Sequence, residues 1–241
     1  MNQLSSWFTL YNDPKWSRFE PEARRLRFDV ETPSGPIRAD TSLVGDFNVD
    51  NLLAAIASAQ CAGLDGEEIE HGLRQVRQVP GRFEAVDEGQ PFLVLVDYAH
   101  TEDALRRLIT AAQCLAEHGR VLTLFGCGGD RDRSKRAPMG RVAGELSDVA
   151  VLTSDNPRTE DPMRIIDDAA RGLREGSAAW TAVPDRKEAI AATLSTARTG
   201  DVVLIAGKGH ETTQTLGNGA IDFDDRLAAR AALREMGYSK P

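Results

Sequence analysis

Short, nearly continuous apolar runs alternate with amphipathic segments through the later part of the chain. Runs at 92–96, 121–125, 149–153 and 202–206 have the length and composition of strands buried on both faces, and a further strand is expected at 180–183. Segments with apolar residues at helical spacing lie between and after them, at 101–115, 139–146, 162–174 and 224–236, and another helix is capped by Asp185. Repeated strand–helix units of this kind predict an α/β fold with a doubly wound, mostly parallel, Rossmann-like sheet. A weaker strand is expected around Thr215.

The first eighty residues follow another pattern. Residues 1–25 show no clear period, and the runs 26–30 and 37–41, separated by a Pro- and Gly-rich segment, predict a β-hairpin. Two helices are expected next, one opening near 45–51 and stopping at Gly63, the other over 66–76. The Pro80-Gly81 pair breaks the chain. We therefore predict two domains, 1–80 and 81–241.

Four of the predicted strands end in polar loops, at 97–100, 128–131, 155–158 and 207–211, and the second and fourth of these contain glycine. Because parallel strands end at the same edge of a sheet, these loops are expected to converge on one ligand. The loop Asp155-Asn156-Pro157-Arg158 suits a zwitterion, with Asp155 facing an ammonium group and Arg158 binding a carboxylate through its planar fork. The alternative is a turn followed by a capped helix beginning at Pro162.

Several other chemistries find no support in the motifs. The segment 207–212 lacks the spacing of a phosphate-binding loop, and 126–129 does not match a dinucleotide-binding fingerprint. His100 and His210 could act as general bases, although a loop histidine is more often a structural donor. No Cys/His spacing predicts a protein-held metal, so any metal would be Mg²⁺ carried by a phosphate substrate.

Charge and cysteine content narrow the function class. The net charge of −8 and a pI near 5.1 argue against nucleic acid or an anionic membrane as the main partner. The three cysteines form no C-x-x-C pair and are expected to be reduced thiols. Neither a secretory signal nor a membrane-spanning run is recognisable. We therefore expect a cytoplasmic location.

An ordered set of motifs resembles the Mur ligases from about Leu26 onward. The motifs are GDFNVDN (45–51), PGR (80–82), DYAHT (97–101), FGCGGDRD (125–132), DNPR (155–158) and AGKGHE (206–211). The resemblance implies an ATP-dependent ligase of bacterial peptidoglycan synthesis that activates a carboxylate as an acyl phosphate, which an incoming amine attacks. The DNPR form implies that the amine donor is meso-2,6-diaminopimelate and the acceptor UDP-N-acetylmuramoyl-L-alanyl-D-glutamate.

The resemblance also implies roles for individual residues. Asn48 and Asn51 match asparagines on the adenine side of ATP, Asp97 an aspartate on the ribose, and Arg82 a catalytic arginine that faces the phosphates. Without the resemblance, the two asparagines could equally be a helix cap and a solvated side chain. The residues implied for diaminopimelate are Arg131, Asp155, Asn156, Arg158, Gly207 and Glu211.

One part of the family pattern has no match in the sequence. The phosphate loop, the Mg²⁺-binding acidic residue, the carbamylated lysine and the UDP-sugar domain of Mur ligases would precede Met1. We therefore expect the tail of a central ATPase domain followed by a C-terminal ligase domain, with little activity alone and a monomeric state. The alternatives are a non-catalytic amino-acid or nucleotide binding module and a lysine-adding or folylpolyglutamate-type ligase.

Overall fold

The computed structural model describes residues 26–43, 47–116, 118–217 and 219–240. Its contacts divide the chain into two compact units, Met1–Val79 and Pro80–Pro241. This division lies one residue before the boundary placed at Pro80-Gly81 from the sequence. The irregular segment 1–25 and the positions Gly45 and Asp46 of the first motif lie outside the described residues.

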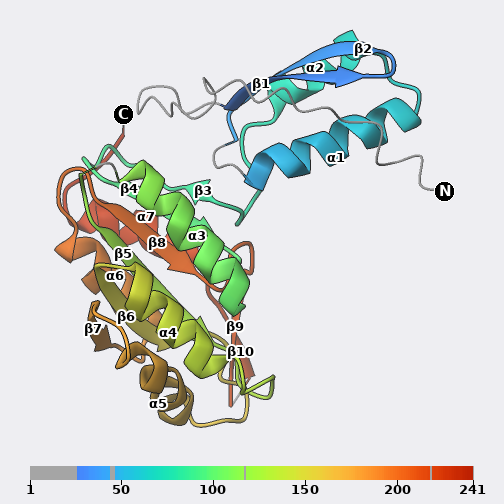
Figure 1. Cartoon of the computed structure of the whole chain (residues 1–241). Helices are drawn as coiled ribbons and strands as arrows, with labels where there is room; N and C mark the ends of the chain where they lie inside the picture. The colour runs from blue at the N-terminus through green and yellow to red at the C-terminus, as the bar shows by residue number, and fades with distance from the viewer. Residues whose placement is uncertain (1–25, 44–46, 117, 218, 241) are drawn as a thin grey trace. The chain divides into compact units, whose positions relative to one another are not determined.

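The first unit contains the expected β-hairpin followed by two helices (Figure 1). Strand β1 (Leu26–Thr32) pairs antiparallel with β2 (Gly35–Thr41). Helix α1 (Phe47–Cys61) precedes α2 (Gly66–Gln75), which begins with a capping box between Asp65 and Glu68. Apolar side chains from the hairpin, from both helices and from the segment between β2 and α1 form one core. Its buried members are Val30, Ile37, Ala39, Leu43, Leu52, Leu53, Ile56, Ile69 and Leu73.

The second unit is built on a six-stranded sheet in the order β3-β4-β8-β5-β6-β7. The bounds are Glu84–Ala85 for β3, Leu93–Asp97 for β4, Val121–Cys127 for β5, Val149–Ser154 for β6, Ala179–Ala182 for β7 and Val202–Ala206 for β8. All neighbouring strands are parallel except β3, which pairs antiparallel with β4. The predicted mostly parallel α/β sheet is thus confirmed.

Helices cover both faces of this sheet, which explains why its central strands are apolar at nearly every position (Figure 1). The helices are α3 (Glu102–Leu115), α4 (Arg136–Leu146), α5 (Pro162–Leu173), α6 (Arg186–Thr196) and α7 (Asp225–Glu235). Val94, Val203 and their same-face neighbours form a core with α6 and α7. Leu95 and Leu204 are equally buried but alternate to the opposite face, where α3 contacts β5 and β8. Among the described helices, none combines the length and apolar content needed to cross a bilayer.

Two features of the second unit were not predicted from the sequence. The edge strand β3 is only two residues long, too short for any alternation to show. The segment around Thr215 is a strand, β9 (Thr213–Leu216), but it forms a hairpin with β10 (Gly219–Asp222) apart from the main sheet. Strand β10 is exposed along its length, and its four residues are too few and too mixed to show the apolar pattern by which buried strands are recognised.

Candidate active site

The loops that follow β4, β5, β6 and β8 are joined to one another at the carboxyl edge of the sheet. The Gly207 N–H donates to the Asp97 carbonyl at 3.0 Å, and the Gly129 N–H donates to the Asn156 carbonyl at 2.9 Å. The Asn156 amide nitrogen, Nδ2, donates to Glu211 Oε2 at 2.9 Å. The structure therefore brings the four polar loops together, as the parallel topology requires.

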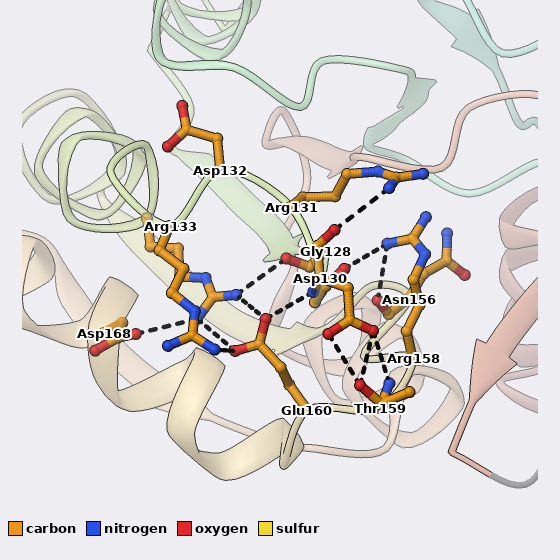
Figure 2. A network of polar contacts seen from close by, with 12 residues as sticks. Gly128, Asp130, Arg131, Asp132, Arg133, Asn156, Arg158, Thr159, Glu160 and Asp168 are labelled. Carbon is orange, nitrogen blue, oxygen red and sulfur yellow. Dashed lines mark hydrogen bonds and ion pairs between the residues drawn. The ribbon is translucent and has the colours of Figure 1, made fainter.

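Arg158 is held close to the loop that follows β5. Its Nη1 donates to the Gly129 carbonyl at 2.7 Å and lies 3.4 Å from the Asn156 carbonyl oxygen (Figure 2). Its backbone N–H donates to the Thr215 carbonyl at 3.1 Å, so the β9–β10 hairpin supports the same loop. Only one nitrogen of the fork, Nη1, donates a side-chain hydrogen bond within the described residues, which leaves the remaining donors able to bind an anion.

Gly128 lies between the two arginines of the site. A Cβ atom placed there would be 3.1 Å from Arg158 Nη1, 3.7 Å from Arg131 Cγ and 3.7 Å from Asp155 Oδ2. Figure 2 shows the Arg131 and Arg158 side chains extending to the same side of this backbone. In the described residues, each guanidinium donates only to backbone carbonyl oxygens and forms no ion pair. Two cationic groups thus lie beside a buried carboxylate without being neutralised by it.

That carboxylate belongs to Asp155, which is 9% exposed. Its Oδ1 atom accepts no hydrogen bond from the described residues, and the Lys208 ammonium is 3.8 Å away. Burial raises the pKa of Asp155 above its ordinary value, and the positive charges of Arg186 and Lys208 offset only part of this effect. A buried acceptor without a hydrogen bond is costly and suggests a donor supplied by a ligand.

Lys208 is a site residue that was not predicted from the sequence. It is fully buried, and its Nζ donates to Asn156 Oδ1 at 3.1 Å and to Glu211 Oε2 at 3.0 Å. Burial acts to raise the pKa of Glu211, but the bonds from Asn156 and Lys208 outweigh it and lower the pKa. The sequence signal for Lys208 is a lysine between two glycines at the end of a strand, although the spacing does not match that of a phosphate-binding loop.

A second unpredicted group lies beneath the loops after β6 and β8. Arg186 and Asp225 form a fully buried ion pair with two bonds of 2.7 Å. The same guanidinium donates to the Ser154 carbonyl at 3.3 Å and the Ala206 carbonyl at 3.0 Å. These carbonyls come just before Asp155 and Gly207, so the pair fixes the ends of both strands.

Two of the residues that the resemblance assigns to the nucleotide, Asp97 and Arg82, lie at or near β4. Asp97 accepts hydrogen bonds from the backbone N–H groups of Phe83 and Ala99, both at 2.8 Å. Burial raises the pKa of Asp97, and these two bonds oppose the rise. Arg82 is exposed, with its guanidinium carbon 5.0 Å from the centre of the Tyr98 ring. Asp97 therefore orders the loop through both carboxylate oxygens, while the Arg82 side chain is exposed.

The two asparagines assigned to adenine belong to the first unit. Asn48 is buried and Asn51 exposed, and the Asn51 amide nitrogen lies 3.2 Å from Asn48 Oδ1 on the first turn of α1. Their amide groups therefore form a pair on one helix face, as the three-residue spacing predicts.

Within the described ranges, no group of three or more His, Cys, Asp or Glu side chains is placed to hold a metal. Cys61, Cys114 and Cys127 are free thiols, and burial raises the pKa of Cys127 to about 12, so it is not a thiolate nucleophile. None of the described residues is therefore assigned to a bound Mg²⁺.

Comparisons with known proteins point to one family. Residues 81–209 match the family model described as "Mur ligase, glutamate ligase domain". The chain is 52% identical over 224 residues to a UDP-N-acetylmuramoyl-L-alanyl-D-glutamate–2,6-diaminopimelate ligase of Solibacter usitatus, covering 93% of this chain and 43% of the relative. It is 50% identical to the ligase of that name from Geobacillus thermodenitrificans, covering 87% of this chain and 43% of the relative.

A solved structure of a ligase with the same name is also similar. It shares 36% sequence identity with this chain at a TM-score of 0.65, covering 88% of this chain and 43% of the solved one. The chain therefore spans less than half the length of these relatives.

Proposed function

Because the chain belongs to the Mur ligase family, we propose that it forms the amino-acid-binding part of an ATP-dependent ligase. The proposed reaction joins meso-2,6-diaminopimelate to UDP-N-acetylmuramoyl-L-alanyl-D-glutamate, as the names of relatives at 52% and 50% identity suggest. The proposed location is the cytoplasm, where ATP and the nucleotide precursor are available.

The observation that carries this proposal is the charge arrangement around Gly128. Arg158 and Arg131 offer free N–H donors, and Asp155 Oδ2 lies beside the same glycine. An amino-acid group carries one carboxylate and one ammonium about a single carbon, so it matches both needs at once. In this proposal Arg158 and Arg131 bind the carboxylate and Asp155 accepts from the ammonium, while Asn156, Gly207 and Glu211 complete the site.

The same arrangement gives a basis for choosing between diaminopimelate and lysine. Diaminopimelate carries an amino-acid group at each end, so one amine can react while the distal carboxylate and ammonium remain bound. Lysine lacks that carboxylate and would leave Arg158 without its anion. A site built around a polar partner can reject an analogue lacking it by roughly 10⁴–10⁵.

The nucleotide residues would serve the activation step. In Mur ligases ATP converts the acceptor carboxylate into an acyl phosphate, which the amine then attacks. Here Arg82 would contact the phosphates as a catalytic residue, Asp97 would hold the ribose, and Asn48 and Asn51 would contact adenine. The exposed guanidinium of Arg82 supports this role, since a preorganised cation stabilises charge that develops on phosphoryl oxygens.

The test is a titration of the whole chain with meso-diaminopimelate, L-lysine, L-glutamate and ATP, followed by NMR chemical shifts so that weak binding is measurable. We expect meso-diaminopimelate to bind at least tenfold more tightly than lysine. Equal binding of lysine would contradict the assigned amino acid, and tighter binding of glutamate would favour a folylpolyglutamate-type ligase. A further assay adds ATP, the acceptor and a protein segment that carries the phosphate loop of the family. Amino-acid binding without ADP release in this assay would favour a non-catalytic module.

A further inference from the structure

Asp130 and Thr159 join the two loops that carry the arginines. The Thr159 N–H donates to Asp130 Oδ2 at 3.1 Å, and the Thr159 hydroxyl lies 3.0 Å from Asp130 Oδ1 and 2.9 Å from Oδ2 (Figure 2). We call this set of bonds the 130–159 clasp. Asp130 directly precedes Arg131, and Thr159 directly follows Arg158. The clasp therefore links the neighbours of the two cationic side chains.

The backbone at the clasp adopts an unusual conformation on both sides. Asp130 and Arg158 each have a φ of +52°, and neither is glycine. A left-handed residue with a side chain costs roughly 1–2 kcal/mol and persists only where its surroundings hold it. Aspartate enters this region more readily than most residues, but arginine has no such preference, so the bonds between the loops hold the backbone of Arg158 in place.

An ion pair between the buried Arg136 and the partly buried Glu160 anchors the clasp to α4 and to the turn before α5. The Asp130 N–H donates to Glu160 Oε1 at 2.6 Å, and the buried Arg136 donates to both oxygens of Glu160 at 2.8 and 3.1 Å. The bond from Arg136, followed by the one from Asp130, lowers the pKa of Glu160 to about 2. Glu160 is therefore charged at neutral pH, and α4 and the turn before α5 hold one side of each loop.

We propose that Asp130 and Thr159 are positioning residues that set the spacing of Arg131 and Arg158 and thereby the preference for an amino acid with a distal carboxylate. This inference rests on the proposed function for its ligand. Binding geometry must be held to within about 0.5 Å by residues that support the contacting side chains. Because the two guanidinium groups come from different loops, only an inter-loop link can fix their separation.

The first test compares Thr159→Val with wild type in titrations of the whole chain. Valine matches the shape of threonine and keeps the backbone N–H but removes the hydroxyl bonds to Asp130. We expect meso-diaminopimelate to bind about fivefold more weakly, the effect of one lost hydrogen bond, and lysine affinity to change less than twofold. Thr181→Val, on the exposed edge strand β7, is the matched control. An equal loss for both amino acids would show that the clasp is merely structural.

A second readout needs no ligand. The Nε–H groups of Arg131 and Arg158 report the order of each side chain by ¹⁵N relaxation. We expect Thr159→Val and Asp130→Asn to lower the order of the Arg158 signal while the Arg186 signal stays fixed in its buried ion pair. Unchanged Arg158 order in both variants would overturn the proposal, whatever the titrations show. If wild type bound neither amino acid, the proposed function would fail, and the relaxation data would still decide whether the clasp holds the arginine.

Discussion

The ammonium of Lys208 lies 3.0 Å from Glu211 Oε2, and the Lys208 side chain is fully buried. The glutamate is 32% exposed, so the two charges meet at the boundary between the core and the site. Asn156 bonds to both partners. This triad joins the loops after β6 and β8 and leaves part of the Glu211 side chain exposed to solvent.

Replacing Lys208 with methionine is expected to destabilise the second unit. The change would leave Glu211 and the buried Asp155 without their nearby cation and Asn156 without one of its donors. We expect a loss of about 3 kcal/mol, the lower end of the range for breaking a buried ion pair, because Glu211 is partly exposed. Urea unfolding of the whole chain measures it, with the exposed Lys187→Met as a control. A loss equal to that of the control would mean that the triad contributes nothing to stability.

Arg158→Ala tests the assignment of the distal carboxylate. We expect the affinity for meso-diaminopimelate to fall roughly 30-fold or more, since truncating one partner of a buried charge pair costs about 2–5 kcal/mol. Affinity for ATP should change less than twofold. Arg164→Ala, an exposed arginine on α5, provides the matched control. Equal losses of amino-acid and ATP binding would show that Arg158 has a structural role instead.

Gly128→Ala probes the space between the arginines without removing a charge. The new methyl group would lie 3.1 Å from Arg158 Nη1, a contact that a flexible guanidinium relieves by moving. We therefore predict weaker meso-diaminopimelate binding with little change in melting temperature. Gly129→Ala is the contrasting variant, because its Cβ would lie 2.0 Å from the Pro157 carbonyl oxygen and must disturb the backbone. A Gly128→Ala protein that binds as wild type does would show that the site tolerates a displaced Arg158.

The sequence was sufficient to predict those parts of the fold that depend on periodicity and caps. The buried strands β4, β5, β6 and β8 read as apolar runs, and Thr101, Asp161 and Asp185 cap their helices as their residue types suggest. The hairpin β9–β10 was only half predicted because exposed strands carry no apolar alternation. Its Thr215 nevertheless supports the backbone of Arg158, so its placement bears on the site.

The site was predictable as a meeting of loops but not as a set of contacts. Parallel topology alone places Asp155 and Glu211 at one edge, and the loops that carry the residues implied for diaminopimelate do meet there. Lys208 and the pair of Arg186 with Asp225 were missed because their burial depends on partners distant in sequence, Asn156 for Lys208 and Asp225 for Arg186. No local pattern shows that Arg186, at the first turn of α6, reaches the Ser154 and Ala206 carbonyls.

Asp155→Asn is expected to separate stability from binding. The pKa of Asp155 is raised in the folded protein, chiefly by burial. An acid whose pKa is higher when folded favours folding below its unfolded pKa, and that contribution is lost as the pH rises through the folded pKa. The difference in melting temperature between wild type and the asparagine variant should therefore shift in favour of the variant as the pH rises over this interval.

The same substitution removes the charge assigned to the ammonium group of the amino acid. We expect meso-diaminopimelate binding to weaken at neutral pH while the melting temperature there is equal to or above that of wild type, a trade-off common at functional sites. Melting curves from pH 4 to 8 and titrations at pH 7 measure the two effects. Glu235→Gln, an exposed carboxylate on α7, controls for loss of a negative charge. A variant less stable than wild type at neutral pH, with its affinity unchanged, would instead make Asp155 a structural partner of Lys208.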